Sequence, residues 1–97
     1  MNSPNSEMQP SGQACWYLYV IETAAGALYT GITTDVERRF GEHCGGRRGA
    51  RSLRGKGPLR LVYHERVGSQ SEALRLEAWL KRQSAKSKHA WLEARRA

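Results

Sequence analysis

The sequence predicts a single α+β domain in which a small three-stranded antiparallel sheet is flanked by helices. Three short segments are rich in aromatic and β-branched residues, as strands are, and three others place apolar residues at helical spacing. The chain has 97 residues, which is enough for one modest core. In chain order, the predicted elements are strand 15–21, strand 27–32, helix 35–44, a helical turn at 50–53, strand 59–67, helix 70–82 and helix 86–95.

The first two strands are expected to form a hairpin. Residues 15–21 read Cys-Trp-Tyr-Leu-Tyr-Val-Ile, and residues 27–32 form a second apolar run. Between them, residues 23–26 have the small and glycine-containing composition of a turn. Such a short connection makes the two strands antiparallel neighbours.

Capping signals mark the start of two helices. Thr34 and Glu37 have the spacing of a capping box, and they precede the helix predicted over 35–44. Ser69 and Glu72 repeat that spacing before the next helix.

Composition narrows the class of protein. Residues 1–14 are polar and predict a disordered tail, which leaves 15–97 as the single domain. We expect no membrane span, because the apolar runs are short, and no signal peptide, so the expected location is cytoplasmic. Cys15 and Cys44 fit no metal-binding spacing and are expected to be free thiols. No obligate protein partner is indicated.

The positive charge is concentrated in one segment. The chain carries a net charge of +7, and residues 38–60 contain eight basic residues against one acidic residue. Arginine binds phosphate through parallel hydrogen bonds, and localised cationic charge attracts polyanions. The alternative is a solvated loop that maintains solubility. The residues expected to bind a nucleic-acid backbone are Arg47, Arg48, Arg51, Arg54, Lys56 and Arg60.

Two polar residues share the apolar face of the first predicted helix. Val36 and Phe40 define that face, and Arg39 and His43 fall within it, whereas Arg38 points away. Taken singly, the histidine could be a satisfied residue at the core edge and the arginine part of a buried salt bridge. Their occurrence one turn apart favours a functional site.

A carboxylate also lies on an apolar face. Ala73, Leu76 and Leu80 form the stripe of the second long helix, and Glu77 belongs to the same side. A buried carboxylate is costly unless it is paired or binds a metal. The alternative is an ion pair with Lys81, four residues later.

The hairpin adds aromatic candidates. Tyr17 and Tyr19 share one face of the first strand, and Tyr29 is central to the second. Aromatic residues in strands are usually part of a core. Gly31 inside a strand predicts close approach by another group, such as a ligand.

These residues together resemble a known family. Tyr17-Leu18-Tyr19 and Tyr29-Thr30-Gly31 are similar to the paired tripeptides that name the GIY-YIG nucleases, although Tyr17 stands where the name has glycine. Arg39, His43 and Glu77 follow at positions that match the family's functional residues. The resemblance spans about residues 16–91 and is greatest to the small, single-domain bacterial group that resembles YhbQ.

The resemblance implies a metal-dependent endonuclease acting on DNA. It implies that Glu77 holds Mg²⁺, with Mn²⁺ as an alternative, and that Arg39 contacts the scissile phosphate. It makes Tyr29 the candidate general base, while Tyr19 and His43 orient water or assist proton transfer. Tyr17 and Gly31 are then structural residues of the site.

The substrate and the alternatives are less sharply defined by the sequence. No recognition helix or zinc finger is apparent, so we expect little sequence specificity, with duplex, single-stranded or branched DNA as substrates and the latter two favoured. Trp16, Tyr17 or Tyr63 would stack bases if exposed.

Many family nucleases carry an asparagine late in the domain, whereas this chain has only Asn2 and Asn5. One alternative is therefore a catalytically silent nucleic-acid-binding module, and another is a domain that binds an acidic protein.

Overall fold

The computed structural model describes residues 14–45 and 48–96 and confirms the predicted α+β class and element order. The predicted tail lies outside these residues except for Ala14. Each boundary differs from its prediction by at most one residue. The elements are β2 (Trp16–Glu22), β3 (Leu28–Thr33), α1 (Val36–Gly45), the 3₁₀ helix η1 (Arg51–Leu53), β4 (Arg60–Gly68), α2 (Gln70–Lys81) and α3 (Ala85–Arg96).

The sheet has the order β3-β2-β4, with the central strand β2 antiparallel to both neighbours. Tyr19 therefore lies between Gly31 on β3 and His64 on β4. Because β2 is central, its side chains are covered on both faces, and Leu18, Val20 and Ile21 are almost completely buried.

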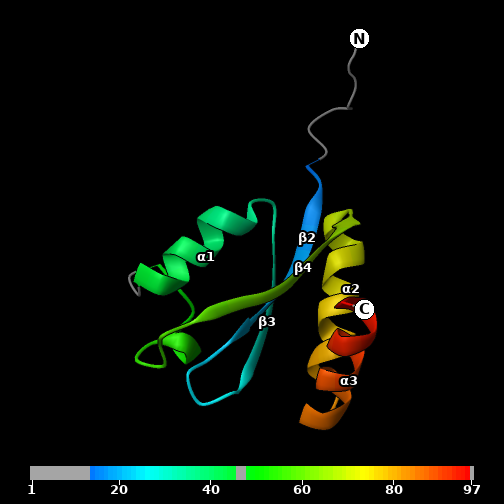
Figure 1. Ribbon diagram of the computed structural model, residues 1–97. Coiled ribbons are helices and arrows are strands. Elements are labelled where there is room, and N and C mark those ends of the chain that lie inside the picture. Colours follow the sequence, from blue (N-terminus) through cyan, green and yellow to red (C-terminus); the bar gives the residue numbers. More distant parts are fainter. Residues whose placement is uncertain (1–13, 46–47, 97) are drawn as a thin grey trace.

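Helices cover the two faces of this sheet, with α1 on one side and the α2–α3 pair on the other (Figure 1). Because successive side chains of β2 point to opposite faces of the sheet, the core is divided into two clusters, one on each face. Leu18 and Val20 pack with Leu80 of α2 and Leu92 of α3. On the opposite face, Tyr19, Ile21 and Leu53 pack with residues of β3, α1 and the following loop.

Helix α1 is capped differently from the prediction. The Asp35 carboxylate accepts a hydrogen bond from the Arg38 backbone N–H at 3.1 Å, and the Thr33 hydroxyl accepts one from the Asp35 N–H at 3.1 Å. The helix begins at Val36, so Asp35 occupies the capping position. The predicted Thr34 cap was therefore wrong.

The capping box of α2 is confirmed. The Ser69 hydroxyl accepts from the Glu72 N–H at 3.2 Å, and the Glu72 carboxylate accepts from the Ser69 N–H at 2.9 Å. Gly68 precedes it with φ +139°, where a Cβ would lie 2.6 Å from the Glu72 Oε1 atom. Glycine is required here both by its backbone conformation and by the cap.

The segment between α1 and β4 is anchored to the rest of the fold. The Ala24 N–H, in the turn between β2 and β3, donates to the Lys56 carbonyl at 3.0 Å. Leu53 is buried beneath the segment at 3% exposure, and Arg60 forms an ion pair with Glu22 at 2.7 Å. The basic residues are thus displayed from a fixed surface of the domain.

Two further predictions can be compared with the structure. Both cysteines are free thiols, as expected. Over residues 14–45 and 48–96, none of the helices is long and apolar enough to cross a bilayer.

Candidate active site

Four of the five predicted catalytic residues meet on the α1 face of the sheet. Tyr19 comes from β2, Tyr29 from β3, and Arg39 and His43 from α1. The His43 ring centroid lies 5.7 Å from that of Tyr19 and 5.3 Å from that of Tyr29, and the two tyrosine centroids are 6.3 Å apart. We call these four residues the tyrosine–histidine cluster.

Gly31 makes room for this cluster. It faces Tyr19 across the strand pair, and a Cβ at Gly31 would lie 2.4 Å from the Tyr19 hydroxyl oxygen and 2.5 Å from its Cζ atom. The group that approaches this glycine is therefore the Tyr19 ring, where a ligand was one expectation. Tyr17 lies half-buried two residues earlier on β2, paired with Thr33.

His43 is buried and uses both ring nitrogens. His43 is only 3% exposed, and the Ala50 backbone N–H donates to its Nδ1 atom at 3.0 Å. An amide can only donate, so Nδ1 carries a lone pair and the proton of the neutral ring is on Nε2. Nε2 then donates to the Tyr19 hydroxyl at 2.8 Å.

The protonation state of His43 follows from the same environment. Burial lowers the pKa of His43, and the nearby positive charge of Arg39 lowers it further, while Glu42 opposes the shift. The ring is therefore neutral at pH 7, which matches the tautomer required by the two hydrogen bonds.

Tyr19 is left with a proton to donate. Because its oxygen accepts from His43, its own O–H can be directed to another acceptor. Burial raises the pKa of Tyr19 far above its ordinary value, the neighbouring Tyr29 raises it further, and Arg39 partly offsets the rise. Tyr19 is thus a neutral hydrogen-bond donor at pH 7 rather than a base.

Arg39 is held from two sides. One guanidinium nitrogen, Nη1, donates to the Glu42 carboxylate at 2.9 Å and to the Arg48 carbonyl at 2.8 Å. Its side chain is 30% exposed, against 58% for Arg38, as their predicted orientations require. The hydrogen bond with Glu42 raises the pKa of Arg39, so the guanidinium stays charged and remains within reach of a ligand from solvent.

Sequence reasoning missed three residues that support the cluster. Glu42 could have been found, because it lies three residues after Arg39 on the same helix. The roles of Ala50 and Gly49 have no comparable signal. A Cβ at Gly49 would lie 2.6 Å from the His43 Cα atom and 2.9 Å from the Glu42 carbonyl oxygen, so the loop rests directly on α1.

Glu77, the fifth predicted catalytic residue, lies on α2, and α2 covers the opposite face of the sheet from α1 (Figure 1). Its side chain is only 17% exposed, as its helical position predicts. Its Oε2 atom pairs with the Lys81 ammonium at 3.2 Å, which was the alternative considered from the sequence.

The donor set limits how this chain could hold a metal. In the part of the chain that the structure describes, no three His, Cys, Asp or Glu side chains come together. The carboxylate of Glu77 is a suitable oxygen ligand for Mg²⁺, but it is a single ligand. An ion bound there would take its remaining ligands from water and phosphate.

The predicted backbone-binding residues form an exposed set near the cluster. Arg47 lies outside the described residues. Arg60 is exposed but engaged with Glu22, and the carbonyl of Arg48 serves Arg39. The exposed members are Arg48, Arg51, Arg54, Lys56 and Arg60.

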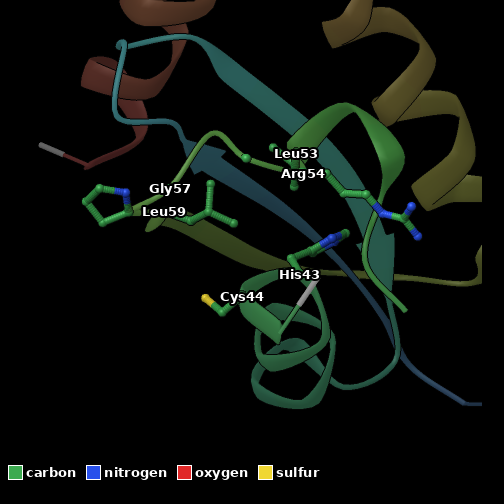
Figure 2. A pocket seen from close by; sticks show the side chains of 8 residues that line it. His43, Cys44, Leu53, Arg54, Gly57 and Leu59 are labelled. Carbon is green, nitrogen blue, oxygen red and sulfur yellow. The ribbon is translucent and has the colours of Figure 1, made fainter. Parts of the chain in front are cut away.

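A cavity of about 290 Å³ separates the end of α1 from this basic loop. His43 and Cys44 line one side, and residues 53–55 and 57–59 contribute the other (Figure 2). Arg54 lines it together with the apolar residues Leu53 and Leu59. The cavity thus brings the basic loop and the buried histidine to a common opening.

Comparison with known proteins identifies the family of this chain. The chain matches the GIY-YIG catalytic domain over residues 15–90. It is 51% identical over 84 residues to a UPF0213 protein of Aeromonas salmonicida, covering 87% of this chain and 60% of that relative. It is 55% identical over 73 residues to a UPF0213 protein of Pectobacterium carotovorum, covering 75% of this chain and 73% of the relative.

A solved structure supports the fold as well. The solution NMR structure of a UPF0213 protein from Bacillus halodurans is 40% identical and superposes with a TM-score of 0.55, covering 82% of this chain and 84% of the other. Family match, sequence identity and fold therefore agree. The chain belongs to the GIY-YIG catalytic domain family and is a relative of the UPF0213 proteins.

Proposed function

We propose that this protein is a metal-dependent endonuclease that hydrolyses DNA phosphodiester bonds with little sequence specificity. The observation that carries the proposal is the tyrosine–histidine cluster, in which a charged arginine and a neutral phenol lie at one partly open site. Membership of a family with a nuclease fold supports it.

Two groups of the cluster would stabilise the charge that develops on the phosphate. Arg39 offers a fixed positive charge, and Tyr19 offers a proton that His43 does not use. Donors that are held in place before the reaction stabilise a developing oxyanion most effectively. His43 is a positioning residue here, because it acts by orienting the Tyr19 hydroxyl.

Tyr29 is the proposed general base. In its ionised form it would take a proton from the attacking water as the new bond to phosphorus forms and the bond to the leaving oxygen breaks. Its ring lies beside those of Tyr19 and His43, which supports this role.

Glu77 would hold the cation, proposed to be Mg²⁺ with Mn²⁺ as a substitute. Such an ion would supply charge neutralisation at the phosphate and at the leaving oxygen. Lys81 occupies Oε2 of Glu77, so cation binding would displace or share that ion pair.

The basic loop would hold the substrate backbone. Its exposed side chains bind phosphates without reading bases, which accounts for weak sequence specificity. Single-stranded and branched DNA are the preferred substrates in this proposal, because no recognition helix for duplex readout is apparent in the sequence.

The test is cleavage of labelled DNA with Mg²⁺ or Mn²⁺ by the protein and four variants. Tyr29→Phe, Arg39→Ala and Glu77→Ala should each lower the rate about 100-fold or more, the usual scale for loss of a transition-state contact. Arg38→Ala is the matched control, because it removes the neighbouring arginine, which is 58% exposed and pairs with Asp35 and Glu42 on the surface of α1. Undiminished cleavage in the first three variants would refute the assignment.

The second candidate is a nucleic-acid-binding module without catalysis. The Glu77–Lys81 ion pair favours it, since it already satisfies the proposed metal ligand. Salt-sensitive DNA binding without cleavage under any metal condition would support this module. Absence of DNA binding at low salt would instead favour an acidic protein partner.

A further inference from the structure

A second basic surface lies on the α2–α3 side of the sheet. The chain outside residues 38–60 is neutral in sum, but residues 73–96 contain seven basic residues and only two acidic ones. These residues form α2 and α3, which lie across the sheet from α1 (Figure 1). The positive charge of the molecule is therefore divided between two faces.

An exposed tryptophan stands within this second surface. Trp79 is 41% exposed and, with Leu74, is one of two large apolar side chains exposed among the described residues. Trp16, Tyr17 and Tyr63, which the sequence suggested as base-stacking residues, are each half-buried. The aromatic residue best placed to meet a base is thus Trp79.

One side of the Trp79 ring packs against other aromatic side chains. Its centroid lies 6.4 Å from that of Trp91, and Trp91 in turn packs edge-on against Tyr63 at 5.7 Å. The Arg95 guanidinium lies 4.5 Å from the centroid of the Trp91 ring. Trp79 is therefore held by packing on one side while it remains open to solvent on the other.

Two arginines flank the tryptophan, one within α2 and one at its C-cap. Arg75 lies one turn before Trp79, and Arg82, the C-cap residue, lies just under one turn after it in the αR conformation, so helical spacing puts the three residues on one side of α2. Both arginines are exposed. An aromatic ring between two exposed guanidinium groups matches a base between two backbone phosphates.

We propose that the surface formed by Arg75, Trp79 and Arg82 is a second nucleic-acid contact, on which a base of a single-stranded segment stacks. The excess of basic residues over residues 73–96 favours a polyanion over a protein partner, because localised cationic charge attracts polyanions and releases their counterions on binding. This contact goes beyond the proposed nuclease activity and does not require catalysis.

The position of this surface gives it a distinct use. The basic loop lies with the tyrosine–histidine cluster on the α1 side, and the Trp79 surface lies on the α2 side. One molecule could therefore hold two segments of a branched nucleic acid, one on each face of the sheet.

The experiment measures binding of a fluorescently labelled 15-nucleotide oligo(dT) in EDTA, so that cleavage cannot interfere. Trp79→Ala and the double variant Arg75→Ala, Arg82→Ala should each weaken binding about 10-fold, within the range for one stacked base or two phosphate contacts. Oligo(dT) should also quench tryptophan fluorescence in the unchanged protein, and the quenching should fall in Trp79→Phe. Arg66→Ala is the matched control, because it removes one exposed arginine from β4 outside both surfaces.

The outcomes separate this proposal from the nuclease proposal. Circular dichroism first verifies that each variant is folded, and the double arginine variant tests the surface without altering the packed rings. Unchanged affinity in that variant together with unchanged quenching in Trp79→Phe would overturn the second contact. If the protein does not cleave DNA but the variants still lose affinity as expected, the nuclease proposal is refuted and the second contact stands.

Discussion

The two faces of the sheet are packed with different chemistry. On the α2–α3 face, the buried residues against β2 are aliphatic, with Leu18 and Val20 meeting Leu80. On the α1 face, the same strand presents Tyr19, whose hydroxyl is hydrogen-bonded to buried His43. One strand therefore contributes to an ordinary apolar core and to a polar cluster through alternate residues.

Under the proposed function, this difference would separate the groups that stabilise the domain from those that react. Apolar contacts tolerate small shifts, whereas buried polar groups depend on the geometry of each hydrogen bond. Substitutions on the α2–α3 face should thus change the free energy of unfolding, and substitutions on the α1 face should change the reaction as well.

Gly31→Ala is expected to have a large effect on the α1 face. The added methyl would lie 2.4 Å from the Tyr19 hydroxyl oxygen and would force the ring away from His43. Because a displacement of about 1 Å in a positioning group can cost about 100-fold in rate, we expect cleavage to fall by at least that factor. The measurement is kcat on labelled DNA for the folded fraction of the variant.

Leu80→Ala is the partner substitution on the other face. It should lower the free energy of unfolding in urea by about 3 kcal/mol, as large-to-small changes in a core do. Cleavage per folded molecule should stay unchanged. Equal loss of activity in the two variants would show that the faces are not separable.

A second, smaller effect is expected where the basic loop rests on α1. Gly49→Ala would place a methyl 2.6 Å from the His43 Cα atom, so the loop must shift. Overpacking of this kind costs about 1–3 kcal/mol in the free energy of unfolding. Gly41→Ala is the matched control within α1, where a Cβ meets nothing within 4 Å.

The control Gly41→Ala should raise the free energy of unfolding, whereas Gly49→Ala should lower it. Replacing an unstrained glycine inside a helix by alanine stabilises a protein by about 1 kcal/mol. Urea unfolding of both variants measures the difference. If Gly49→Ala were as stable as Gly41→Ala, the loop would not depend on this contact.

The smallest expected effect is a pH dependence of the α1 face. Burial lowers the pKa of His43 below its value of about 6.5 in the unfolded chain. Below that pH the unfolded state binds more protons, so stability is full above about 6.5 and is lost as pH falls through the folded pKa. Protonation at Nδ1 would also place two donors, the ring N–H and the Ala50 N–H, against each other.

Unfolding in urea between pH 5 and 7.5 tests this dependence. The His43→Gln variant removes the titrating ring and should flatten the slope across that range. The acidic groups with lowered pKa values, Glu42 and Glu72, affect stability only at lower pH. A slope that survives in His43→Gln would assign the effect to another group.

The fold could be predicted from the sequence almost completely, because alternation, helical spacing and turn residues are local signals. The orientation of Arg39 relative to Arg38 was also local, since it follows from one helix. The predicted N-cap of α1 was wrong by one residue, because Thr34 and Asp35 are both residue types that cap helices well and only the exact start of the helix distinguishes them.

The site could be predicted less well, because its contacts join segments that are distant in the sequence. The hydrogen bond from Ala50 to His43 and the approach of Tyr19 to Gly31 depend on how the loop and the strands pack. Composition also concealed the second basic surface, since acidic residues elsewhere in the chain balanced its charge in the sum. Charge has to be counted along each face rather than along the chain.

The loop supports the reactive residues through its main chain, with the Arg48 carbonyl on Arg39 and the Ala50 amide on His43. Every amino acid can supply the carbonyl at position 48, and every amino acid except proline can supply the amide at position 50. Exposed side chains of the loop can therefore differ without disturbing these two hydrogen bonds, provided that position 49 stays glycine. Under the proposed function, surface substitutions would change substrate preference while the contacts to Arg39 and His43 are kept.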